Sequence, residues 1–176
     1  MINIVALVQL KAFARVDALA LAGLWIASFV AVVAMPGASV GGLLAMITPL
    51  MLYWLLRRFR DKVLDGYISF RRGLAYTWYT SFYACLLFAV VQYVYFQFLD
   101  NGTFLANIET SLKEAAPAYR EMGMSVAQLE EAVRTVGLMP PVQLVFAFMM
   151  QNLFACCLMS FPLALVAVRR NNKESE

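Results

Sequence analysis

Three long stretches of this chain contain no charged residue, and they constrain its fold more than any other feature. The first covers positions 18–56, the second positions 73–99 and the third positions 135–168. An ionised side chain near the centre of a lipid bilayer is energetically costly, so stretches of this length indicate helices that cross a membrane. The first stretch is long enough for two such helices, and each of the others for one. The sequence therefore predicts an all-α membrane protein with four transmembrane helices.

Composition supports this class and limits the domain organisation. Hydrophobic residues make up 62% and charged residues 14% of the 176 positions, whereas a soluble domain has roughly 45–50% and 25%. The Thr48-Pro49 pair predicts a kink within the second span, because proline removes a backbone donor. We expect one integral membrane domain over residues 1–176, with spans at about 18–35, 41–56, 74–99 and 142–168.

The basic residues are distributed unevenly between the two sides of such a bundle. Eleven of the 14 Lys and Arg residues lie in the N-terminal stretch, in the connection 57–73 and in the C-terminal tail. The segment 100–141 holds only three basic residues against six acidic ones. Because basic connections stay on the cytoplasmic side, we expect both termini and the connection 57–73 to be cytoplasmic, and the segment 100–141 to be external.

The external segment carries the pattern of two short amphipathic helices. The first begins near Phe104, and we expect it to end where Pro117 interrupts the helical spacing of apolar residues. The second opens at Ser125, which forms an S-x-x-Q capping box with Gln128, and it ends at Gly137. We expect this pair to cover the bundle, to lie among lipid headgroups or to present a docking surface.

Small residues recur every fourth position in the first span, at Gly23, Ala27 and Ala31. Such spacing lets helix backbones approach closely in lipid. The stripe predicts either packing against the second span, which the short connection holds nearby, or a seam between two copies of the chain.

Three amides are the strongest hydrogen-bonding side chains at depth in the predicted spans: Gln92, Gln151 and Asn152. Left unpaired in hydrocarbon they would be costly, so each should face another helix or a polar ligand. They predict either hydrogen bonds between helices or the lining of a polar groove.

Six basic residues in the connection 57–73 are candidates for contact with a lipid phosphate or headgroup: Arg57, Arg58, Arg60, Lys62, Arg71 and Arg72. Guanidinium groups suit phosphate oxygens, and basic residues beside headgroups gain about 1 kcal/mol each from anionic lipid. The alternative is that they serve only to set the orientation of the chain. We expect no nucleic-acid partner, because the connection is short and held to the membrane at both ends.

The sequence offers few groups for chemistry. It contains no histidine, and its three cysteines all fall within predicted spans. No acidic or basic residue lies within a predicted span, which leaves a proton or ion path without an obvious carrier. We therefore predict no catalytic residue, no metal site and no cofactor. The exception would be a membrane-embedded enzyme in which external carboxylates such as Glu109, Glu114 and Glu121 converge.

Several short motifs resemble those of one known family. They are DGYISFRRG at positions 65–73, YVYFQFLD at 93–100, MGMS at 122–125 and LEE at 129–131. Together they resemble domain-of-unknown-function family 4199, and the resemblance covers essentially the whole chain. It implies a small four-span, multi-pass protein of the inner (cytoplasmic) membrane of Bacteroidota-type bacteria. The family supplies no catalytic residues. The chain is also similar to proteins that are often found beside membrane glycosyltransferases that use polyprenyl phosphate.

Two hypotheses follow for the function. The first is a non-enzymatic accessory or scaffold subunit of a membrane assembly that handles lipid-linked sugars or envelope lipids. Its expected partners are membrane lipids and either a membrane protein, such as a polyprenyl-phosphate glycosyltransferase, or a second copy of the chain. The alternative is a small dimeric translocator of lipids or polyprenyl-phosphate sugars.

Overall fold

The computed structural model describes residues 4–35 and 39–169, and its regular structure is helical. Four segments are long and apolar enough to cross a membrane: Leu7–Ala34, Val40–Val63, Phe70–Leu99 and Pro141–Ala167. The predicted all-α fold with four membrane-spanning segments is confirmed. Residues 36–38, which follow the predicted first span, and the basic tail residues Arg170 and Lys173 lie outside the described residues. The elements in chain order are α1 (Ile4–Ala34), α2 (Val40–Met46), α3 (Thr48–Val63), α4 (Phe70–Val94), the π-helix η1 (Tyr95–Leu99), α5 (Thr103–Glu121), α6 (Val126–Gly137) and α7 (Pro141–Ala167).

The second span is broken at Ile47, between α2 and α3. Pro49 stands in the first turn of α3, where its missing N–H costs no helical hydrogen bond. The indole N–H of Trp25 on α1 donates to the Thr48 hydroxyl oxygen at 3.0 Å, which fixes the break against the first helix. The kink expected from the Thr48-Pro49 pair is therefore present.

The contact between α1 and α2 depends on Gly41. The Ser28 hydroxyl donates to the Gly41 carbonyl oxygen at 2.7 Å, and a Cβ atom on Gly41 would lie 2.9 Å from the Ser28 carbonyl oxygen. Only glycine allows this approach. Gly23 and Ala27, by contrast, are exposed. These two residues therefore do not pack against the second span, because α1 turns a different face toward it. Ala31 is half-buried, and a seam between two copies of the chain stays a prediction.

A buried carboxylate joins three helices at the end of the bundle where α1 begins and α7 ends, which we call the basic end. Asp17 on α1 is 4% exposed. The hydroxyl of Tyr76 on α4 donates to its Oδ2, and a guanidinium nitrogen of Arg58 on α3 lies 3.6 Å from its Oδ1. The ring of Phe59 stacks on that of Tyr76, with centroids 4.4 Å apart. α1 continues on the N-terminal side of the predicted span, so this charged side chain is buried in the helical bundle just outside the charge-free stretch.

The basic connection is shorter than the sequence predicted. α3 continues to Val63 and α4 begins at Phe70, so only a turn at residues 64–69 separates them. The turn is tied to the end of α7 by two backbone hydrogen bonds, of 3.1 and 3.2 Å, between Ile68 and Arg169. All six basic residues therefore lie on helices, where the helical phase decides which way each side chain points.

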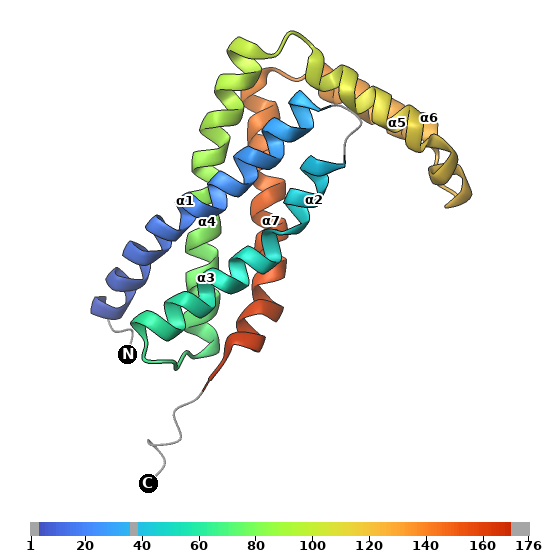
Figure 1. The fold of residues 1–176 in the computed structure, drawn as a ribbon. Helices are drawn as coiled ribbons and strands as arrows, with labels where there is room; N and C mark the ends of the chain where they lie inside the picture. The colour runs from blue at the N-terminus through green and yellow to red at the C-terminus, as the bar shows by residue number, and fades with distance from the viewer. Residues whose placement is uncertain (1–3, 36–38, 170–176) are drawn as a thin grey trace.

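α5 and α6 lie side by side and extend sideways from the opposite end of the bundle, where α4 ends and α7 begins (Figure 1). We call these two helices the arm. The expectation that α5 ends at Pro117 is wrong: it continues to Glu121, and backbone hydrogen bonds close the turns beyond the proline. The Ser125 cap is confirmed, with its hydroxyl oxygen accepting from the Gln128 backbone N–H at 3.4 Å.

A π-helical turn connects α4 to the arm. The backbone N–H of Asp100 donates to the Tyr95 carbonyl oxygen at 2.8 Å, five residues back. Phe104, at the start of α5, then packs its ring against Phe96 and Phe148, with centroids 5.0 and 5.9 Å away. The base of the arm is thus held by aromatic packing on the bundle, whereas α6 has no buried residue.

We expect Tyr76→Phe to lower the free energy of unfolding by about 1.5–3 kcal/mol, since a buried hydrogen bond to a carboxylate is lost while the ring stack remains. Denaturant titration in mixed detergent micelles measures this. Tyr79→Phe is the matched control, because the Tyr79 hydroxyl forms no hydrogen bond with the described residues. Equal stability of the two variants would contradict a structural role for the Asp17–Tyr76 contact.

Candidate functional site

The basic end contains a hollow of about 430 Å³ on the surface of α3. Arg57, Arg58 and Lys62 line it, together with the rings of Tyr53 and Trp54 and the carboxylate of Asp61. The Arg58 guanidinium lies 5.7 Å from the Trp54 ring centroid. Arg57 and Arg58 keep 53% and 43% of their side chains exposed, so both can still reach a ligand. Cations beside amphipathic rings form a surface that suits anionic lipid headgroups.

The other three predicted basic residues are not part of this hollow. Arg60 is 3% exposed, and its guanidinium donates to the Ala167 carbonyl oxygen at 3.1 Å and to Asp61 at 2.6 Å. The prediction that Arg60 contacts lipid is therefore corrected: it ties α3 to α7. Arg71 and Arg72 lie in the first turn of α4, Arg71 exposed and Arg72 half-buried.

A cavity of about 440 Å³ lies within the bundle, between α1, α4 and α7. Gln92 and Asn152 both line it, as the groove hypothesis requires. Gln92 is 4% exposed, and its Oε1 has no hydrogen-bond partner among the described residues. The remaining walls are mostly aromatic and aliphatic: Trp25, Phe29, Val32, Phe88, Phe104, Phe148 and Met159.

Gln151 is separated from this cavity, although it is the neighbour of Asn152 in the sequence. It lies on the exposed face of α7. Met150, Phe154 and Leu158 surround it on that face and are 44%, 66% and 56% exposed. Of the three amides, the structure thus brings two into one cavity and turns the third outward.

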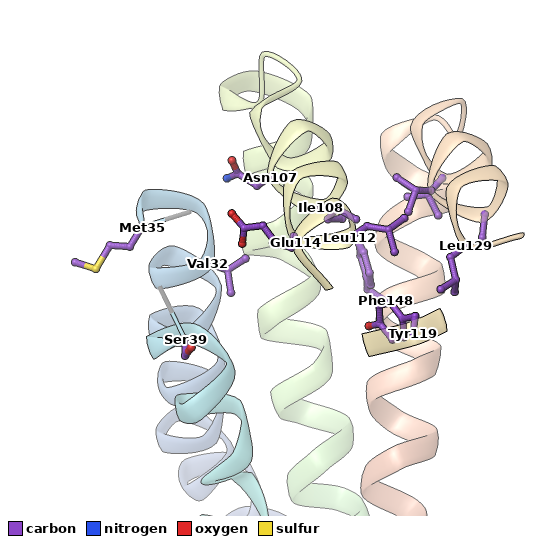
Figure 2. A pocket seen from close by; sticks show the side chains of 14 residues that line it. Val32, Met35, Ser39, Asn107, Ile108, Leu112, Glu114, Tyr119, Leu129 and Phe148 are labelled. Atoms are coloured by element: carbon purple, nitrogen blue, oxygen red, sulfur yellow. The ribbon is translucent and has the colours of Figure 1, made fainter. Parts of the chain in front are cut away.

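A second hollow, of about 590 Å³, lies between the arm and the end of α1. Val32 and Phe148 line both this hollow and the bundle cavity, so the two adjoin. The polar groups along it include Asn107, Ser111 and Glu114, which are on one face of α5. We call this hollow the arm groove (Figure 2).

The carboxylates required by the enzyme hypothesis do not converge. Glu114 lines the arm groove, whereas Glu109 lines a separate hollow between α5 and α6 with Lys113, Glu130 and Arg134. Glu121, at the end of α5, lines neither of them. Within residues 4–35 and 39–169, no group of three or more His, Cys, Asp or Glu side chains is arranged to hold a metal ion.

Sequence reasoning missed Asp17. It stands at the edge of the first charge-free stretch, where an acidic residue resembles an ordinary boundary at the membrane surface. The residues that reach it, Tyr76 and Arg58, are distant in the sequence and gave no local signal. Its neighbours Lys11 and Arg15 on the same helix instead lie 5.0 and 5.3 Å from the ring centroids of Tyr79 and Tyr83 on α4.

The motifs and the four-span architecture agree with one family model, described as Protein of unknown function (DUF4199), which matches residues 17–169. The chain belongs to this family. The resemblance drawn from the short motifs is thereby confirmed, and the matched region includes both Asp17 and the bridge at Arg169. No curated protein and no solved structure matches the chain significantly.

We expect the double variant Arg57→Gln, Lys62→Gln to bind phosphatidylglycerol about thirtyfold more weakly, since each basic residue contributes about 1 kcal/mol beside anionic lipid. Native mass spectrometry of the detergent-purified chain during lipid titration measures this. Lys113→Gln, Arg120→Gln removes the same charge from the arm and is the control. A similar loss in the control would show that net charge, rather than the hollow, governs binding.

Proposed function

We propose that the protein is a non-enzymatic accessory subunit of an assembly in the bacterial inner membrane that handles lipid-linked sugars or envelope lipids. The single observation that supports this best is the exposed amide of Gln151. α7 has 27 residues, and at about 1.5 Å per residue it is long enough to cross a hydrocarbon core of about 30 Å. Gln151 is ten residues from its start, about 15 Å along the axis, which is the middle of such a core.

An amide in that position has no water to bind. In this chain, its neighbours on the exposed face of α7 are apolar. A hydrogen bond from a helix of another protein satisfies it, and such bonds hold transmembrane helices together with about 0.6–2 kcal/mol each. The exposed rings and aliphatic side chains around Gln151 supply the packing surface. We propose a membrane enzyme as the partner, with a polyprenyl-phosphate glycosyltransferase as the first candidate because of the resemblance noted in the sequence.

The test is affinity purification of the tagged chain in a mild, lipid-retaining detergent, with co-purifying proteins quantified by mass spectrometry. We expect a stoichiometric membrane enzyme with the wild type and about a tenfold loss with Gln151→Leu, since 1.4 kcal/mol corresponds to tenfold in affinity. Met150→Leu, at an exposed residue one position away, is the control and should retain the enzyme. A wild-type eluate that contains only further copies of this chain would contradict the proposal, as would full retention by Gln151→Leu.

A dimeric lipid translocator remains the second candidate, and the bundle cavity favours it. Two amides facing one apolar cavity provide polar contacts for a headgroup during its passage, and the free Oε1 of Gln92 is available to accept a hydrogen bond. This candidate requires that lipid movement depend on the cavity rather than on α7's exposed face.

For this second candidate we expect Gln92→Leu, Asn152→Leu to slow the flipping of fluorescent lipid in proteoliposomes at least tenfold, because the headgroup loses its polar contacts. Chemical quenching of the outer leaflet measures the rate. Gln97→Leu removes an amide from the exposed end of the same span and should leave the rate unchanged. Wild-type protein that flips no lipid, or a double variant as fast as wild type, would rule the translocator out.

A further inference from the structure

The arm groove has the construction of a lipid site rather than of a general surface hollow. Its walls are largely apolar, with Ile108 and Leu112 on α5, Leu129 and Val133 on α6, and Phe148 on α7. Its inner end adjoins the bundle cavity, since Val32 and Phe148 line both hollows. The arm leaves the bundle where two membrane-spanning segments end, which is the depth of lipid headgroups.

The polar groups of the groove define which headgroup fits. Asn107, Ser111 and Glu114 are spaced four and three residues apart, and Figure 2 shows Asn107 and Glu114 on the side of α5 that faces the end of α1. The Nδ2 atom of Asn107 is buried without a hydrogen-bond partner among the described residues, so it offers a donor. Glu114 offers a negative charge. No Lys or Arg is among the residues that the structure places along this groove.

Charge complementarity determines which class of lipid fits the arm groove. A lipid with only a phosphate would bring its negative charge to Glu114 with no cation to compensate it, which is unfavourable. A zwitterionic headgroup with an amine places an ammonium on the carboxylate of Glu114, while a phosphate or ester oxygen accepts from the Asn107 amide. Both unmatched groups of the groove are then satisfied by one molecule.

We infer that the arm groove binds one amine-bearing zwitterionic phospholipid, with its headgroup between Asn107 and Glu114 and an acyl chain directed toward the bundle cavity. This site is separate from the partner surface at Gln151 and from the cationic hollow on α3. Each of the three can therefore fail on its own.

The test uses the purified full chain and native mass spectrometry, with phosphatidylethanolamine and phosphatidylglycerol of identical acyl chains as probes. We expect Glu114→Gln to weaken phosphatidylethanolamine binding up to about fivefold, the usual limit for a partly exposed ion pair. Glu109→Gln removes the same charge from the same helix but lines a different hollow, so binding should be unchanged. Arg57→Gln, Lys62→Gln should affect only phosphatidylglycerol.

Ser111→Trp provides a second test of the site. A large ring in the groove should displace phosphatidylethanolamine whatever the role of Glu114. Equal affinity for both lipids at all sites, with no effect of Glu114→Gln or of Ser111→Trp, would overturn the inference. Gln151→Leu should lose the partner enzyme without changing the lipid preference of the arm groove. Failure of the lipid inference is therefore distinguishable from failure of the proposed function.

Discussion

A carboxylate held inside a membrane-spanning bundle requires compensation, and the packing of the basic end follows from how Asp17 obtains it. Tyr76 and Arg58 approach it from α4 and α3, so one side chain of α1 fixes the relative position of three helices. Arg60 and the Ile68–Arg169 bridge then attach α7 to the same end. The other half of the bundle contains the cavity, and it is held by aromatic packing together with the hydrogen bonds from Trp25 to Thr48 and from Ser28 to Gly41.

The two ends consequently present different chemistry to a membrane. Cations gather around the aromatic hollow on α3, whereas the arm groove combines an amide donor with a carboxylate. We propose that the cationic end prefers anionic lipid and that the arm groove prefers zwitterionic lipid. The exposed amide of Gln151 lies between these ends and is directed at neither, which is what a separate surface for another membrane protein requires.

The sequence predicts the spans well because charge-free stretches report directly on the solvent that a segment can occupy. Local signals also transfer: Pro49 places the break in the second span, and Ser125 caps α6. The sequence does not show which side of each helix faces the bundle and which side faces outward. Gln151 and Asn152 are adjacent, yet successive residues on a helix point about 100° apart, so one lies outside and the other lines the cavity. Likewise Arg60 is buried, whereas Arg58, two positions earlier and about 200° away around the axis, is partly exposed. Asp17 required knowledge of Tyr76, 59 residues away.

The π-turn at the end of the third membrane-spanning segment helps to set the direction of the arm, together with the loop at residues 100–102 that follows it. The π-turn of η1 accommodates one more residue than an α-helical turn, and one residue corresponds to about 100° of rotation around the axis. Losing a single position between Tyr95 and Leu99 would therefore swing the arm to another side of the bundle, with every side chain of α5 and α6 unchanged. The arm groove therefore forms only when η1 holds the arm in its present direction.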